Sequence, residues 1–265
     1  MAHMNGFTHG MVNPLLAYLI ATIGAALGLR CTVRALALPR EQRRGWLLLA
    51  AAALGCGIWT MHFIAMLGFS VTDSTVLYNV PLTLVSLAVA VAVVGLGVFY
   101  VGYRPQGLRT LLVGGVLTGV GVAGMHYIGM SAMNVDGVVS YRPLMVAASV
   151  GIAVFAATAA LWMTLNIRGF WPSVLSALVA GVAVTAMHYT AMQAVTVRLS
   201  QEVHPSGTPA ADFVLPVAVG IVVFLTAAAI IVAMSPHDPD RRRRKDSEDQ
   251  ERIQVLLFDG KTRGL

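Results

Sequence analysis

Long apolar stretches alternate with short polar connections along most of the chain. A helix that crosses a bilayer needs about 20 mainly apolar residues, because each residue advances the helix by about 1.5 Å. Seven stretches are long enough, and we predict one span in each of residues 11–29, 47–69, 80–101, 111–133, 144–167, 173–197 and 213–234. Since the connections are short, this pattern predicts an all-α integral membrane protein, with seven transmembrane helices in one bundle over residues 11–234.

The two ends of the chain depart from this pattern. Residues 1–10 form a short N-terminal segment that we expect on the extracytoplasmic side of the membrane. Residues 235–265 contain a run of basic residues, Arg241 to Lys245, followed by mixed charges. Dense charge with little apolar surface is typical of solvated segments. We therefore predict a flexible cytoplasmic tail.

The positions of the arginines predict the orientation of the bundle. Short cytoplasmic connections retain Lys and Arg, and the first, third and fifth connections and the tail are the basic ones. The second connection has no basic residue, and the fourth and sixth have one each, Arg142 and Arg198. We expect a multi-pass protein of the inner (cytoplasmic) membrane with its N-terminus outside. The net charge of +6 then reflects topology and attraction to anionic lipid, and indicates no nucleic-acid partner.

Only 11% of the residues are charged, and their positions exclude several kinds of membrane chemistry. The only lysines, Lys245 and Lys261, lie in the tail, so no span can form a retinal Schiff base. No Asp or Glu lies within a predicted span, which argues against carboxylate proton relays and di-iron carboxylate sites. We predict no catalytic site.

A hexapeptide recurs three times, as MHFIAM, MHYIGM and MHYTAM. Its histidines, His62, His126 and His188, fall near the ends of the second, fourth and sixth predicted spans, which indicates three repeated helix pairs. Because alternate spans run in the same direction, we expect all three histidines in one layer near the outer face.

Two further residue types recur at helical spacing around each histidine. Glycine stands seven residues before it, at Gly55, Gly119 and Gly181, and is predicted to serve close helix packing. Methionine stands four residues after it, at Met66, Met130 and Met192. Seven and four residues bring a side chain back to nearly the same helix face. Each even span thus presents Gly, His and Met on one face.

Imidazole and thioether together favour copper, especially Cu(I). We predict that His62, Met66, His126, Met130, His188 and Met192 bind one or two copper ions. A second rank of ligands is Met61, Met125, Met187 and His9. Two alternative roles remain for the histidines. They could form interhelical hydrogen bonds in a purely structural subunit, or two of them could be the axial ligands of a haem.

These residues resemble the MHYT domain, a bacterial integral-membrane sensor module named after the motif. The resemblance covers residues 7–234 and implies copper bound by the motif's His and Met near the outer face. It also implies sensing of a diatomic gas, O2, CO or NO, or of redox state. Many members continue into GGDEF and EAL domains of cyclic di-GMP metabolism, whose motifs this sequence lacks. We therefore expect a separate cytoplasmic signalling partner. A copper transporter is the competing interpretation.

Overall fold

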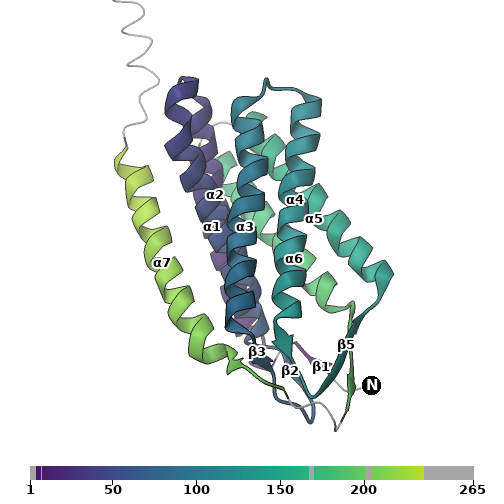
Figure 1. Cartoon of the computed structure of the whole chain (residues 1–265). Helices are drawn as coiled ribbons and strands as arrows, with labels where there is room; N and C mark the ends of the chain where they lie inside the picture. Colours follow the sequence, from purple (N-terminus) through teal and green to yellow (C-terminus); the bar gives the residue numbers. More distant parts are fainter. Residues whose placement is uncertain (1–3, 7, 167–169, 201–204, 236–265) are drawn as a thin grey trace, which may run out of the picture. The chain divides into compact units, whose positions relative to one another are not determined.

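The computed structural model describes residues 4–6, 8–166, 170–200 and 205–235, and each predicted span contains one long helix (Figure 1). The helices that cross the membrane are α1 (Val12–Leu36), α2 (Arg43–Met66), α3 (Val80–Tyr103), α4 (Leu108–Ser131), α5 (Pro143–Asn166), α6 (Phe170–Met192) and α7 (Ala210–Met234). A short 3-10 helix (Arg40–Gln42) precedes α2. All seven are long and apolar enough to cross a bilayer. The chain is thus a multi-pass membrane protein; its predicted tail, residues 236–265, lies outside the described residues.

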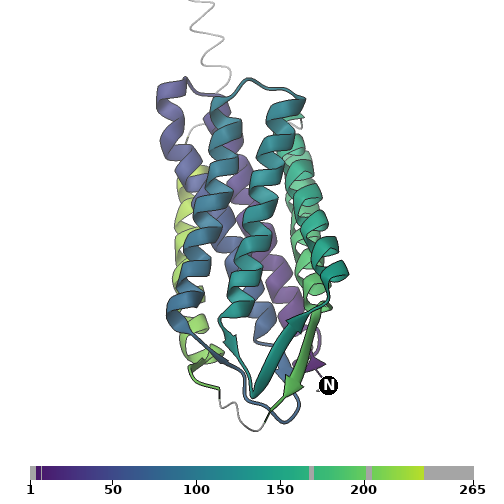
Figure 2. The same ribbon diagram turned by 45° about the vertical axis from the view of Figure 1, so that its right-hand side comes forward.

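In the described part of the chain, seven short strands lie at one end of the bundle, which we call the strand end (Figures 1 and 2). They are β1 (Met4–Asn5), β2 (Ser70–Val71), β3 (Leu77–Tyr78), β4 (Met133–Asn134), β5 (Gly137–Tyr141), β6 (Val195–Leu199) and β7 (Thr208–Pro209). They pair antiparallel as β1 with β2, β3 with both β4 and β7, and β5 with β6. The helical pattern did not predict these strands.

The prediction was wrong at the end of α6, because residues 195–197 belong to β6 and not to the sixth span. Val195, Thr196 and Val197 are β-branched and suit an extended strand. In the structure Val195 pairs with Tyr141 and Val197 with Val139. The α1 helix, by contrast, is longer than the predicted span, since it continues to Leu36, past Arg30 and Arg34. Long arginine side chains can place their charge in the interface while the helix continues.

Two compact units make up the chain, Met1–Ala229 and Ile230–Leu265, and the bundle described here is the first. Within it α1 to α6 form a closed ring, in which each helix packs on its two neighbours and α6 returns to α1. The glycines seven residues before the histidines lie at three of these contacts. An added Cβ would stand 2.7 Å from Val91 Cα at Gly55, 2.5 Å from Val154 Cα at Gly119, and against the Thr22 hydroxyl at Gly181.

The first of these contacts joins α2 to α3 and the second joins α4 to α5, but the third joins α6 to α1. In the sequence repeat, α7 follows α6 as α3 follows α2. In space, however, the helix that packs on α6 in this position is α1 and not α7. The strands next to these two helices are also separate, since β1 pairs with β2 while β7 pairs with β3. The α7 helix lies against the ring through a single stripe, formed by Val214, Ala218, Ile221, Leu225 and Ala228. The first helix, α1, thus closes the ring.

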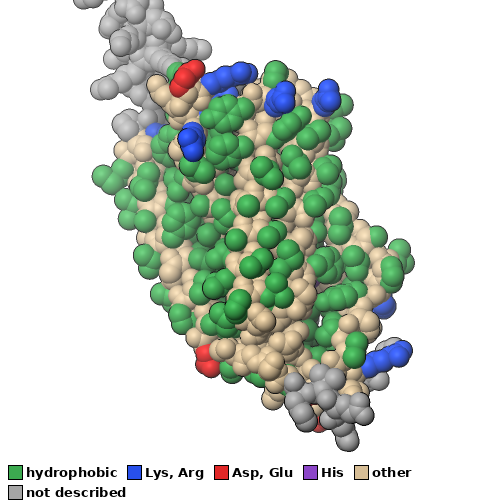
Figure 3. All heavy atoms as spheres, in the orientation of Figure 1, with side chains coloured by type: hydrophobic (Ala, Val, Ile, Leu, Met, Phe, Trp, Pro, Cys, Tyr) green, Lys and Arg blue, Asp and Glu red, His purple; other side chains and the backbone are tan. Residues whose placement is uncertain are grey.

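Burial and charge follow this arrangement. In the most apolar 18-residue window of each helix, 67% of the residues are buried in α2 but only 22% in α7. Apolar side chains cover the flank of the bundle in Figure 3, and basic side chains gather at the end opposite the strands, which we call the basic end. There Arg43 donates hydrogen bonds to the carbonyl oxygens of Leu38 (2.9 Å) and Gly102 (2.6 Å). One half-buried cation thus joins the α1–α2 connection to the end of α3.

Candidate metal centre

The three hexapeptide histidines meet inside the ring. His62, His126 and His188 lie in the last turns of α2, α4 and α6, and each is almost fully buried. Their Nδ1 atoms are 3.0 Å (His62 to His188), 3.2 Å (His62 to His126) and 3.3 Å (His126 to His188) apart. Among the described residues, this is the only group of three or more His, Cys, Asp or Glu side chains close enough to share a metal ion.

Hydrogen bonding alone cannot account for this arrangement. In the plane of an imidazole, Nδ1 carries either one proton or one lone pair. Three such atoms that face one another include at least two of the same kind, so no assignment of protons gives every nitrogen its own partner. Three lone pairs directed at one cation remove the conflict. The interhelical hydrogen-bond alternative is therefore the weaker explanation of the triad.

The spacing of the three nitrogens also fits a shared ion. Two histidine nitrogens at about 2.0 Å from one ion are about 3.3 Å apart in tetrahedral and about 3.5 Å apart in trigonal geometry. The three Nδ1 separations lie at or slightly below these values. Two axial haem ligands would need nitrogens about 4 Å apart on opposite faces of a porphyrin. The triad therefore fits a single ion and does not fit haem.

Aromatic side chains surround the triad. Each histidine ring is nearly perpendicular to the ring of the next residue, with centroids 4.6 Å apart for Phe63 and 5.0 Å apart for Tyr127 and for Tyr189. Metal-binding histidines usually donate their second N–H to an acceptor. Here the Nε2 atoms of His62 and His126 are buried and have no hydrogen-bond partner among the described residues. Packing holds these two rings more than hydrogen bonding does.

Gly129 shows how closely the rings are packed. It lies on α4 one turn after His126, and a Cβ added there would stand 2.8 Å from His62 Nε2. The first and third hexapeptides carry alanine at the same place, Ala65 and Ala191. Glycine in the second copy therefore makes room for the ring that α2 contributes.

The structure places the predicted methionines differently from the histidines. Met66 and Met130 are buried and Met192 is half-buried, each one helical turn beyond its histidine. Met61, Met125 and Met187 are buried core residues. His9 is exposed, its Nδ1 is 3.3 Å from the Thr8 hydroxyl, and it is not part of the triad. The thioethers as ligands therefore stay a prediction.

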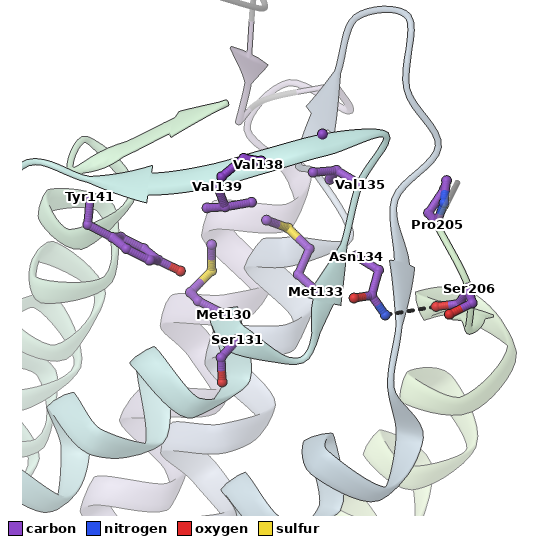
Figure 4. A pocket seen from close by; sticks show the side chains of 11 residues that line it. Met130, Ser131, Met133, Asn134, Val135, Val138, Val139, Tyr141, Pro205 and Ser206 are labelled. Atoms are coloured by element: carbon purple, nitrogen blue, oxygen red, sulfur yellow. Dashed lines mark hydrogen bonds between the residues drawn. The ribbon is translucent and has the colours of Figure 1, made fainter. Parts of the chain in front are cut away.

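A cavity of about 520 Å³ lies at the strand end, and its lining begins one helical turn after His126 on α4. Met130 lines it, together with Met133 and residues of β4 and β5 (Figure 4). The sequence interpretation did not single out Met133, which follows the end of α4 and lies in β4. No repeat marks it, because the first and third copies have Phe69 and Val195 at its place. Tyr141 also lines the cavity, and its ring packs edge-on against the ring of Tyr127, with the ring centroids 5.8 Å apart. Burial, with a smaller effect of Tyr127, raises the pKa of the Tyr141 phenol.

Comparison with known proteins agrees with the repeat. A sequence model of the MHYT family, described as a bacterial signalling protein N terminal repeat, matches residues 55–114, 119–177 and 181–244. Each match begins at a glycine of the set Gly55, Gly119 and Gly181. No solved structure matches the chain.

Curated relatives are longer signalling proteins. The bifunctional diguanylate cyclase/cyclic di-GMP phosphodiesterase MucR of Pseudomonas aeruginosa is 36% identical over 230 residues, which are 82% of this chain and 33% of the relative. The cyclic di-GMP phosphodiesterase NbdA of the same organism is 37% identical over 205 residues, 73% of this chain and 25% of the relative. The signaling protein YkoW of Bacillus subtilis is 27% identical over 224 residues, 80% of this chain and 27% of the relative. The chain spans a third or less of the length of these relatives.

Proposed function

The chain belongs to the MHYT family of bacterial signalling proteins, and on that premise we propose that it is a membrane sensor module whose three histidines bind one metal ion. The observation that carries the proposal is the convergence of three buried Nδ1 atoms from three repeats. Three neutral imidazoles in an apolar site form a ligand set without charge. Such a set favours a low-charge, soft ion, and Cu(I) is the first choice.

Copper at this site would supply the ability to bind a diatomic gas such as O2, CO or NO, or to change oxidation state. The histidines hold the ion, while the aromatic rings beside them and the buried helix ends exclude water. Met66, Met130 and Met192 are the proposed additional soft ligands, because they lie one turn beyond the histidines. The less favoured additional ligands are Met61, Met125, Met187 and His9.

The triad also joins the three even helices. Because His62, His126 and His188 come from α2, α4 and α6, any change in their ligation alters the packing of these helices against one another. A signal requires that the ligand bind two packing states with different affinity. We propose that the basic end of the bundle faces the cytoplasm and presents this difference to a signalling partner, and that the strand end and the metal face outward.

The partner class follows from the relatives. Two of them are named for making or degrading cyclic di-GMP. We propose that this module regulates an enzyme of cyclic di-GMP metabolism on the cytoplasmic side, and we assign the module itself no catalytic activity. Copper transport is the weaker alternative, since no second cluster of His, Cys, Asp or Glu continues the site through the described part of the bundle.

Metal analysis of the purified protein tests the proposal. The full chain is reconstituted with Cu(I) under anaerobic conditions, washed and analysed for copper per chain. We expect one tightly held ion in the wild type, none in the His62→Ala, His126→Ala, His188→Ala variant, and an unchanged content in His9→Ala. Equal copper in wild type and triple variant, with both folded by circular dichroism, would reject the site.

A further inference from the structure

The cavity at the strand end has an exposed polar rim and a buried thioether floor. Ser131 and Ser206 at its rim are exposed, and Asn134 spans the rim by donating a hydrogen bond of 2.8 Å to the Ser206 carbonyl oxygen. Met130 and Met133, by contrast, are 1% and 5% exposed. Figure 4 shows the two thioethers converging beneath Val139. The cavity thus places two buried thioethers beneath a polar rim.

This pair of sulfurs belongs to the second repeat alone. Three residues after the last methionine of the hexapeptide, the second copy has Met133, where the first has Phe69 and the third has Val195. Phe69 and Val195 offer no donor atom. The three repeats thus share the histidine layer, while only the second adds a second thioether at the approach to it.

The cavity floor adjoins the triad through one helical turn. Met130 lines the cavity, and His126 stands four residues earlier on the same face of α4. Gly129 separates the two, and it has no side chain to fill the space between α4 and the His62 ring. Met130 thus links the cavity lining to the histidine layer along α4.

We propose that this cavity is a loading site for a soft monovalent cation, in which Met133, together with Met130, binds Cu(I) on entry. The ion then leaves Met133 for the histidine triad, where Met130 is one of the proposed additional ligands. The inference rests on the proposed metal site. Thioethers are neutral, soft and weaker donors than a set of three imidazoles, so the ion moves from the cavity to the three nitrogens without a change of charge or oxidation state. The polar rim replaces part of the ion's hydration shell as it enters.

The test measures the rate and the extent of loading separately. Full-length protein in detergent is mixed with Cu(I) held by a chromophoric Cu(I) chelator, and loss of the chelator's colour gives both quantities. Met133→Leu is the test variant, because Leu conserves volume and shape well enough to keep the fold and removes the sulfur. Met163→Leu is the matched control, since Met163 is half-buried on α5 and does not line the cavity.

We expect Met133→Leu to load several-fold more slowly than wild type and to reach the same copper content, while Met163→Leu loads at the wild-type rate. Loading of Met133→Leu at the wild-type rate would overturn the proposal. A lower final content in Met133→Leu would also overturn it, because Met133 would then be a permanent ligand. Failure of the wild type to hold more copper than the triple histidine variant would instead reject the metal site itself.

Discussion

At the scale of single residues, the distinctive feature is which histidine atoms face one another. The Nδ1 atoms converge, and the buried Nε2 atoms of His62 and His126 have no partner in the described part of the chain. Histidines that bind metals are commonly oriented by hydrogen bonds. In this protein the orientation depends on ring packing, so a small change in packing volume acts directly on the ligand geometry.

Gly129→Ala tests this dependence on packing. The new methyl group would stand 2.8 Å from His62 Nε2, so the ring has to rotate or move away from the other two. We expect copper affinity to fall by about 10- to 100-fold, as when groups that orient metal-binding histidines are changed. Competition with a Cu(I) chelator measures it. Gly124→Ala on the same helix is the control, because nothing lies within 4 Å of its added Cβ; an equal loss there would contradict the packing argument.

Tyr78 gives a prediction for alkaline stability. Its hydroxyl is buried with no hydrogen-bond partner among the described residues, and burial raises the pKa of the phenol above its usual value of 10.0. Above about pH 10 the unfolded chain releases this proton while the native state keeps it, so the free energy of unfolding falls with rising pH. We expect Tyr78→Phe to lose less stability than wild type between pH 9 and pH 11, in roughly the window where the two states differ.

Thermal unfolding in detergent at several pH values measures the effect of Tyr78→Phe, with Tyr103→Phe as a control at a half-buried tyrosine near the basic end. At neutral pH we expect the Tyr78 variant to be as stable as wild type or more stable, since removing an unpaired buried hydroxyl costs little. A neutral-pH loss well above that of Tyr103→Phe would show that the hydroxyl has a partner.

At the scale of helices and strands, the hydrophobic pattern predicted the helices but not the strands or the local side-chain geometry. All seven spans and the layer of histidines followed from helix length and period. The strands did not, because runs of two to five residues at helix ends carry no period that separates them from a helix, as at residues 195–197. The convergence through Nδ1 and the cavity at Met133 also escaped prediction, since they depend on ring orientation and on chain packing after α4.

Gly119→Ala tests the role of the recurring glycines. Its added Cβ would stand 2.5 Å from the Val154 Cα, a backbone atom that cannot move without shifting α5. We expect a loss of about 1–3 kcal/mol of stability from overpacking, measured by thermal unfolding in detergent. Gly151→Ala on α5 is the matched control, because its Cβ meets nothing within 4 Å, and it should be neutral or gain up to about 1 kcal/mol. Equal behaviour of the two variants would contradict the close contact.

At the scale of the whole bundle, the helices that are paired by the sequence repeat are not all paired in the folded structure. The sequence repeat pairs α6 with α7, whereas the ring pairs α6 with α1 and leaves α7 attached through one stripe. Sequence periodicity could not predict this, because α1 carries no copy of the hexapeptide. The histidine layer is therefore enclosed by α1 to α6.

The orientation of the ring in the membrane is testable by labelling. In a variant whose two free cysteines, Cys31 and Cys56, are replaced by alanine, single cysteines are introduced at Val138 in β5 or at Gln42 at the basic end, both exposed. We expect a membrane-impermeant maleimide to label Val138→Cys in intact cells and Gln42→Cys only after permeabilisation. The reverse pattern would place the metal layer on the cytoplasmic side.

The central claim is that three Nδ1 atoms, one from each repeat, bind one ion. X-ray absorption spectroscopy at the copper edge on the reconstituted full chain tests it most directly. The account predicts a shell of three histidine nitrogens at about 2.0 Å, the usual distance to a first-row metal, which loses one nitrogen in His188→Ala. A copper spectrum without histidine scattering, or one that His188→Ala leaves unchanged, would contradict it.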